Sequence, residues 1–383
     1  EISCSLVGSE MCIRDRLTTV YSGFNYGSSL QALAGKKIIE QSGLECELIK
    51  LKSIVKGRDF RLKKLFTIFF RSLFLSKTNI LKTYQNSYNK SFIVGTEDLF
   101  YHFTDFYLCP RETSWLQLKK IAKNAVACFS GSDQIWNSAT LYVDPLYYLR
   151  FASPYKRIAL SPSFGRNFIA DYNKKKMAKW ISEYPFLSIR EDSGVTLIKE
   201  LTGKTAEHLL DPTLIINASQ WKEILKIKNK RGEYILAYFL DTPSLTAKEV
   251  LKNLKHKLNC EVIAIPYQFE DMSYCDRVLA SGPKEFVDLI ANARFVCTDS
   301  FHGTAFAINM HTPFLVFERE YGSASKQSER ILSILRKVNM VERYQQMSID
   351  ENIDNIDFEY AENILTKERN KAYMYINLSL IHI

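Results

Sequence analysis

The sequence lacks most of the features that mark secreted, membrane-spanning or metal-dependent proteins. Its eight cysteines form no CxxC pair, which favours free thiols in a reducing compartment over disulfides or a zinc site. No uncharged apolar run reaches the roughly 18 residues that a membrane-spanning helix needs. No HExxH motif and no DxD pair occur, so the sequence predicts no metal site. These absences together indicate a cytoplasmic protein.

Several phosphate-binding and hydrolytic motifs are also missing. The chain has no GxGxxG, no Walker lysine and no GxSxG elbow, so neither dinucleotide binding, nor a P-loop, nor serine hydrolysis is supported. Its 383 residues are 46% hydrophobic and carry a net charge of +9. This composition predicts two folded domains and an anionic partner such as a phosphate ester, a carboxylate or a membrane face. No nucleic-acid motif accompanies the charge, so nucleic acid is not an expected partner.

The two ends of the chain differ in character from the rest. Residues 1–16 have neither the order of a signal peptide nor a clean amphipathic period, and residues 378–383 are equally out of place. Both resemble translated adapter or assembly sequence. We therefore expect a non-native leader at 1–16 and a non-native tail at 378–383.

Short apolar runs, small polar loops and helix-like stretches alternate along the chain. Such alternation is typical of open, mainly parallel sheets. The fold class that we predict is α/β, with two Rossmann-like domains facing a cleft. The expected segments are an N-terminal domain at 17–213, a basic boundary at 214–230, a C-terminal domain at 231–345 and a helical segment at 346–377.

A basic and apolar insertion interrupts the first domain at about residues 56–82. A helix here would carry arginines and lysines on one side and leucines and phenylalanines on the other. That pattern suits peripheral contact with an anionic membrane. An inserted helix packed over the cleft is the alternative.

The segment Thr298 to Gly303 is the strongest candidate for chemistry. It follows the apolar run 295–297 and precedes a helix-like stretch, so free backbone N–H groups would point into the loop. We expect His302 to transfer protons near neutral pH. The neighbouring side chains of the loop are expected to bind substrate; they are Asp299, Ser300, Phe301 and Gly303. Helix capping with a structural histidine is the alternative.

Further candidates lie at the ends of other predicted strands. Arg190 ends an apolar strand, and its fork suits a carboxylate or phosphate, unless it pairs only with its acidic neighbours. Two small-residue loops are expected to bind substrate, with turn formation and helix capping as their alternatives; they contain Gly131, Ser132, Asp133 and Gln134, and Asn25 and Gly27. Asp211, before Pro212, is interpreted as fixing a turn.

Taken in order, the motifs resemble the polysaccharide pyruvyl transferase family. The matching segments are Asn25-x-Gly27 with Leu30-Gln31, Gly131 to Asn137, Ser163-Phe164-Gly165, Ser188 to Gly194, Leu210 to Thr213, and Thr298 to Thr304. The resemblance implies a GT-B-like fold and transfer of pyruvate from phosphoenolpyruvate to two hydroxyls of a sugar, without any other cofactor. It implies that His302 is the acid or base and that Arg190 clamps the donor. The acceptor would be a sugar or lipid-linked oligosaccharide of a surface polysaccharide.

One position departs from the family's pattern. Ser300 stands where some relatives carry an arginine, which leaves the donor without one expected cation. Lys284, Arg294, Arg319 and Lys326 are the candidate substitutes. A GT-B glycosyltransferase that uses a nucleotide sugar, and a catalytically idle glycan-binding protein, remain the competing hypotheses.

Overall fold

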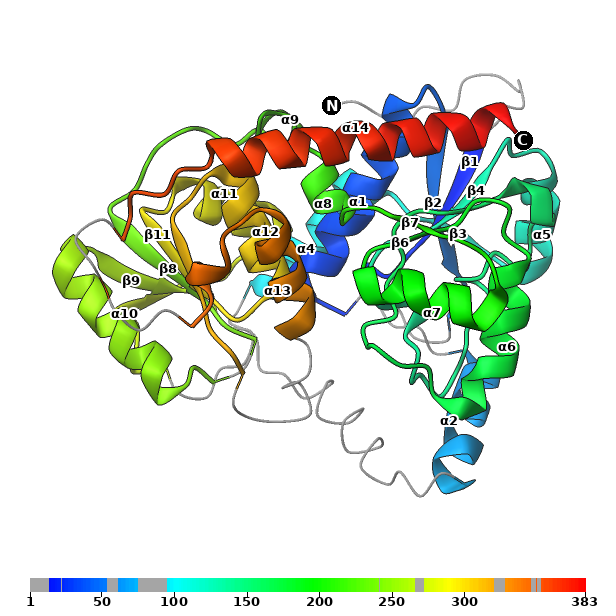
Figure 1. The fold of residues 1–383 in the computed structure, drawn as a ribbon, viewed down its shortest axis with the longest axis horizontal. Helices are drawn as coiled ribbons and strands as arrows, with labels where there is room; N and C mark the ends of the chain where they lie inside the picture. The colour runs from blue at the N-terminus through cyan, green and yellow to red at the C-terminus, as the bar shows by residue number, and fades with distance from the viewer. Residues whose placement is uncertain are drawn as a thin grey trace.

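The computed structural model describes residues 14–21, 23–53, 61–74, 95–240, 242–265, 272–319, 328–345, 349 and 353–383. Two parallel sheets of five strands each form two lobes that lie side by side (Figure 1). A long C-terminal helix lies across both lobes. The predicted fold class, α/β with two Rossmann-like domains in a GT-B-like arrangement, is confirmed by these sheets.

The N-terminal domain is built on the sheet of order β3-β2-β1-β4-β5. Its strands are β1 (Arg14–Thr18), β2 (Glu45–Leu51), β3 (Arg111–Thr113), β4 (Cys128–Ser130) and β5 (Arg157–Ala159), with a separate pair β6 (Ser188–Ile189) and β7 (Glu207–His208). Its main helices are α1 (Tyr26–Gln41), α2 (Leu62–Phe74), α4 (Thr96–Phe103), α5 (Trp115–Lys123), α6 (Asp171–Ser182) and α7 (Asp192–Thr202). Strands β4 and β5 are buried throughout, as expected for parallel strands covered on both faces.

The C-terminal domain repeats this plan with the order β10-β9-β8-β11-β12. Its strands are β8 (Tyr234–Tyr238), β9 (Glu261–Ala264), β10 (Arg277–Val278), β11 (Phe295–Thr298) and β12 (Phe314–Val316). Its helices are α10 (Leu245–Leu258), α11 (Pro283–Asn292), α12 (Phe301–Met310) and α13 (Ser328–Lys337). Helix α12 is buried along its whole length, so the loop before it is held at the centre of the molecule.

Two short helices connect the domains. Helices α8 (Pro212–Ile215) and α9 (Ala218–Leu225) overlap the predicted boundary 214–230, and Trp221 and Leu225 of this segment are fully buried. The segment therefore packs into the core although its composition is basic and polar. The residue limits of the two domains stay a prediction.

The C-terminal helix α14 (Glu359–Ile381) ties the two domains together. Its buried Arg369 donates hydrogen bonds to Leu214 O, at 3.0 Å, and to Asn309 Oδ1 of α12, at 3.1 Å. Further along the helix, the Tyr375 hydroxyl donates to Ala159 O in the first sheet, at 2.9 Å. Helix α14 therefore contacts both domains, and Figure 1 shows it lying across them.

Element limits near the chain ends differ from those expected. Strand β1 begins at Arg14, within 1–16, and α14 continues to Ile381, within 378–383. Asp15 accepts a hydrogen bond from the Ala127 amide at 2.6 Å, and Arg16 pairs with Glu47 at 2.6 Å. The non-native origin of the two ends stays a prediction.

Of the predicted insertion 56–82, residues 61–74 are described, and α2 occupies them from Leu62. In the described part of the chain, none of the helices combines the length and apolarity that crossing a bilayer requires. The described cysteines are all free thiols, and four of the six are buried.

Candidate active site

Polar loops from both domains converge beside α8, α12 and α13. Five side chains meet there, here called the polar cluster: Asp133, Arg190, Asp211, His302 and Arg330. The first three belong to the N-terminal half of the chain and the last two to the C-terminal domain. The convergence is therefore a product of domain packing, at the strand ends where open α/β folds place ligands.

Arg190 is a buried cation of the polar cluster, with a side chain only 3% exposed. Its Nη1 donates to Asp211 Oδ2 at 2.5 Å. Its Nη2 lies 3.9 Å from Asp133 Oδ1, and its Nε lies 3.6 Å from Glu191 Oε1. Neither Nε nor Nη2 makes a hydrogen bond. A buried guanidinium with two donors left is suited to bind an anion bidentately.

Asp211 holds the cluster together and is a site residue that sequence reasoning missed. Its Oδ1 accepts from the amide and hydroxyl of Thr213, at 2.9 and 2.8 Å, while Oδ2 faces Arg190 and His302. Burial alone would raise the pKa of Asp211, but His302 and Arg190 outweigh it and hold that pKa well below its usual value. The turn expected at Pro212 exists, and the carboxylate that forms it also partners Arg190.

His302 lies in the first turn of α12 and is nearly buried. Its Nε2 is 3.8 Å from Asp211 Oδ2, too far for a hydrogen bond, and makes no other. The ring lies directly over α1: a Cβ placed on Gly27 would be 1.9 Å from Nδ1. An imidazole with one nitrogen unpaired beside an ionised carboxylate is well suited to proton transfer.

The first turn of α1 shapes the other side of the cluster. Asn25 caps the helix by accepting from the Ser28 amide at 3.0 Å, and the Ser28 hydroxyl donates to Asp133 Oδ2 at 2.7 Å. Burial would raise the pKa of Asp133, but Arg190 and His302 together lower it below the usual value. Asn25 thus has the capping role, and Gly27 makes room for His302.

The loop 131–134 combines backbone and side-chain roles. Gly131 has φ +143°, and a Cβ there would be 1.7 Å from Leu160 O. The buried Ser132 donates from Oγ to Ser161 O at 2.6 Å and accepts at its carbonyl from Thr19. These two residues set the loop's path. Asp133 and Gln134 place their side chains toward the cluster.

Arg330 of α13 is the second missed residue. Its two terminal nitrogens lie 3.1 Å from the Gln134 amide, in the orientation that turns the amide oxygen to the guanidinium. Its guanidinium carbon is 5.8 Å from the ring centre of Phe301, and that of Arg190 is 4.9 Å from the same ring. Burial, followed by the nearby Arg190, lowers the pKa of Arg330 to about 10. It therefore stays charged at neutral pH.

The remaining predicted residues organise the loop before α12. The Asp299 carboxylate accepts from the Leu240 amide at 2.7 Å and from Arg319 Nε at 3.0 Å. The Ser300 hydroxyl caps α12 by accepting a hydrogen bond from the Gly303 amide at 3.4 Å. Gly303 is tightly packed, since a Cβ there would be 2.5 Å from Thr298 Oγ1. These three residues are engaged with protein groups, and their contact with substrate stays a prediction.

The cations proposed to replace the expected arginine are placed differently. Arg319 bonds Asp299, and Arg294 pairs with Glu233 at 3.1 Å and Asp354 at 3.4 Å. Lys284 lies on α11, and Lys326 lies outside the described residues. Besides Arg190, Arg330 approaches Phe301, the neighbour of Ser300, although it was not among the proposed cations. Its sequence context, in a polar amphipathic helix, gave no signal of this role.

The space beside the cluster is small because the domains are closed over it. A cavity of about 20 Å³ borders Arg190, Asp211, Phe301 and Arg330, room for about one water molecule. The rim is closed by contacts between domains, including Ser333 Oγ to Asp192 Oδ2 at 3.0 Å.

A sequence profile described as polysaccharide pyruvyl transferase matches residues 25–321. No curated protein matches the chain. A putative UDP-N-acetylglucosamine 2-epimerase from Listeria monocytogenes aligns at 8% identity over 94% of this chain and 90% of that one, with a TM-score of 0.45. MnaA of S. aureus, in a structure with UDP, aligns at 10% identity over 92% of this chain and 98% of that one, with a TM-score of 0.43. MurG of Acinetobacter baumannii aligns at 11% identity over 97% of this chain and 100% of that one, with a TM-score of 0.40.

Proposed function

The chain belongs to the polysaccharide pyruvyl transferase family, and from that premise we propose that it moves pyruvate from phosphoenolpyruvate onto a sugar. The product is a cyclic ketal on a precursor of a cell-surface polysaccharide, and phosphate is released. The single observation that carries the proposal is the buried Arg190, whose Nε and Nη2 lack hydrogen bonds beside His302. Phosphoenolpyruvate is the only co-substrate proposed, with no further cofactor.

The donor's two anionic groups match the two guanidiniums of the polar cluster. A carboxylate and a phosphate are separate acceptors, and Arg190 and Arg330, from different domains, both approach the Phe301 ring. Each guanidinium offers parallel N–H groups to a planar or tetrahedral anion. Because Arg190 is buried and both groups are held by neighbouring side chains, charge that develops in the reaction is stabilised with little reorganisation.

The chemistry begins with protonation of the donor. His302 gives a proton to the methylene carbon of phosphoenolpyruvate, and a cationic centre develops at the adjacent carbon. One sugar hydroxyl adds there and loses its proton. The carbon–oxygen bond to phosphate then breaks, and a second hydroxyl adds with loss of its proton. Of the two hydroxyl protons, one restores His302 and the other leaves on phosphate, and the ketal is released. His302 serves as the acid, and its Nε2 lies 3.8 Å from Asp211 Oδ2.

The test is incubation of the purified chain with phosphoenolpyruvate and a panel of nucleotide-linked and lipid-linked sugars. We expect phosphate release and a pyruvyl mass increment on one acceptor. His302→Ala is expected to lose at least about 100-fold in rate, the range of a lost general acid. Full activity in His302→Ala contradicts the assignment. Nucleotide release without phosphate indicates a glycosyltransferase, and sugar binding without turnover indicates an idle binding protein.

A membrane-linked acceptor is supported by helix α2. Its apolar side chains face outward, while Arg71 points inward and donates to Leu141 O and Asn173 Oδ1, both at 3.1 Å. Six large apolar side chains are exposed: Leu62, Phe66, Phe69, Phe70, Leu73 and Phe74. Lys63 is exposed beside them. We infer peripheral contact with an anionic bilayer.

Vesicle sedimentation tests this contact. Wild-type protein is expected to sediment with phosphatidylglycerol vesicles and less with phosphatidylcholine vesicles. Phe70→Ser and Phe74→Ser together are expected to release it, whereas Phe168→Ser, an exposed phenylalanine outside α2, is the matched control. Equal sedimentation of all three proteins contradicts membrane docking by α2.

A further inference from the structure

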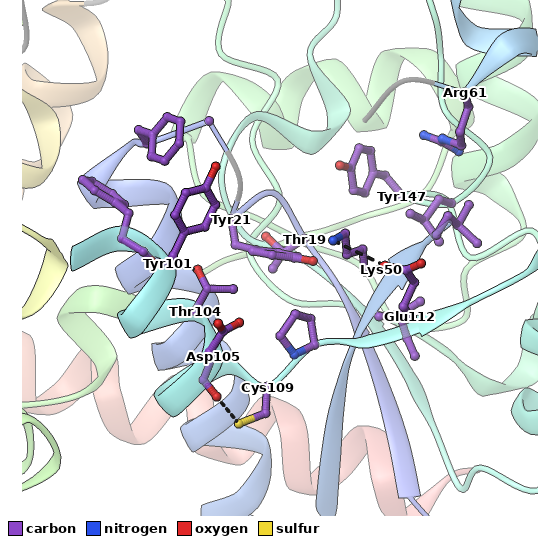
Figure 2. A pocket seen from close by; sticks show the side chains of 17 residues that line it. Thr19, Tyr21, Lys50, Arg61, Tyr101, Thr104, Asp105, Cys109, Glu112 and Tyr147 are labelled. Atoms are coloured by element: carbon purple, nitrogen blue, oxygen red, sulfur yellow. Dashed lines mark hydrogen bonds and ion pairs between the residues drawn. The ribbon is translucent and has the colours of Figure 1, made fainter. Parts of the chain in front are cut away.

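A large cavity lies away from the polar cluster, in the N-terminal domain. It has a volume of about 740 Å³ and lies where strands β1, β2 and β3 end (Figure 2). The carboxyl ends of parallel strands are where open α/β sheets bind ligands, and this volume falls within the usual range of small-molecule sites. Neither the sequence motifs nor the proposed donor chemistry uses it.

One wall of this cavity is aromatic. Phe24 packs edge-on against Phe100 and Tyr101, with ring centres 5.7 and 5.5 Å apart. Tyr21 and Tyr101 point into the same space in Figure 2, and Tyr147 faces them from the far side. Tyrosine rings combine a flat apolar face with a hydroxyl, which is the surface that a sugar ring and its hydroxyls require.

The opposite wall is polar and balanced in charge. Lys50 and Glu112 lie 3.5 Å apart, and Arg61 pairs with Asp144 at the edge. Asp105 adds a second carboxylate to the lining. Paired charges offer donors and acceptors to hydroxyl groups, but two carboxylates oppose a polyanion such as a nucleoside diphosphate.

The cavity is joined to the polar cluster by two short connections. Thr19 of the lining donates to Ser132 O at 3.2 Å, next to Asp133. Phe24 of the aromatic wall directly precedes Asn25, the cap of α1, and the His302 ring packs against Gly27 of that helix. A ligand held in the cavity therefore borders the loops that form the reaction centre.

We propose that this cavity holds the uncharged glycan part of the acceptor, a subsite that rests on the proposed pyruvyl transfer. The aromatic wall stacks on the sugar ring, and Lys50, Glu112 and Asp105 bond its hydroxyls. Arg61 lines the cavity and directly precedes α2. A glycan in the cavity thus lies beside the helix with the outward apolar face.

The test measures sugar and donor binding separately on the full chain. Saturation-transfer NMR would use methyl glycosides of glucose, galactose, mannose and N-acetylglucosamine, with UDP as the nucleotide probe. Binding of phosphoenolpyruvate would be followed by thermal shift. We expect saturation transfer to at least one glycoside, and about a tenfold loss of its affinity in Tyr101→Ala, as for a lost aromatic contact. Glu112→Gln, a change on the polar wall, is expected to lower the affinity for the same glycoside.

Controls separate this proposal from the proposed function. Tyr155→Ala removes an exposed tyrosine outside the cavity and is expected to bind sugar like wild type. Tyr101→Ala is expected to retain the thermal shift by phosphoenolpyruvate. Three outcomes overturn the subsite: no glycoside binds, both cavity variants bind the sugar like wild type, or UDP displaces the glycosides. Glycoside binding with no response to phosphoenolpyruvate leaves the subsite standing and refutes the donor.

Discussion

At the residue scale, the ion pair of Arg190 and Asp211 is the feature on which the candidate site depends. Both side chains are buried, and Asp211 also fixes the start of α8 through Thr213. A buried pair is costly to break from one side, because the remaining charge has neither water nor a partner. The same two residues therefore combine a folding role with a binding role.

Asp211→Asn tests the folding role through its pH dependence. Because the folded-state pKa of Asp211 is depressed, its stabilisation is present above the unfolded value of about 3.9 and is lost as pH falls below it. We expect Asp211→Asn to lower the free energy of unfolding by about 3–5 kcal/mol at pH 7. Below about pH 5 the gap to wild type should narrow.

Urea unfolding at several pH values measures this effect. Asp98→Asn, an exposed aspartate in the first turn of α4, is the control and should follow wild type. A difference between Asp211→Asn and wild type that stays constant from pH 7 down to about pH 2 would contradict the linkage.

Arg330→Gln tests whether α13 supplies the cation that position 300 lacks. The change removes a partly buried charge that has Gln134 and Phe301 as neighbours. We expect the KM for phosphoenolpyruvate to rise at least about tenfold, the value of one charge-assisted hydrogen bond, with a smaller change in kcat. Initial rates of phosphate release give both constants. Arg231→Gln, an exposed arginine, should leave them unchanged.

At the element scale, the contact between α1 and α12 positions the proposed acid. His302 lies on the backbone of Gly27, so any Cβ at that position must displace the imidazole. Gly27→Ala is expected to lower kcat about 100-fold, since a displacement of about 1 Å is enough for such a loss. Helix stability should change little, because alanine is the better helix former.

Gly35→Ala is the matched control within α1, since a Cβ there would meet only Leu17 Cδ2 at 3.3 Å. Circular dichroism melting and phosphate-release assays on both variants separate folding from positioning. Wild-type kcat in Gly27→Ala would show that the ring needs no such support.

At the scale of the whole molecule, closure of the two domains controls access to the polar cluster. The cavity of about 20 Å³ is too small for a phosphorylated substrate, and α13 meets α7 through Ser333 and Asp192. Helix α14 spans both domains and would keep them joined while this side opens. Relative motion of domains across polar interfaces is the usual behaviour of such proteins.

Ser333→Cys with Asp192→Cys tests this opening. A disulfide or a short bis-maleimide between the two thiols should lock α13 to α7 and abolish turnover. Reduction of the disulfide should restore the activity, and each single variant should remain active throughout. Full turnover by the locked protein contradicts an opening at this contact.

The fold class and most of the polar residues were predictable from sequence, because apolar strands and capping residues are local signals. Phe295 to Thr298 is a buried strand, and Ser300 caps the helix after it, as the pattern of residue types predicts. Asp211 was recognised only as a turn residue, since its second partner, Arg190, is 21 positions away. Arg330 gave no signal, because nothing in α13 distinguishes it from other surface arginines.

The sequence by itself determined the two Rossmann-like units and the His302 loop, because hydrophobic period, caps and glycines act over a few residues. Only the tertiary structure decided which polar ends meet. It placed Gly27 against His302, both Arg190 and Arg330 at the Phe301 ring, and an aromatic cavity beside Thr19. These contacts join segments far apart in the chain, and their geometry is set by how the two domain cores pack rather than by any local pattern.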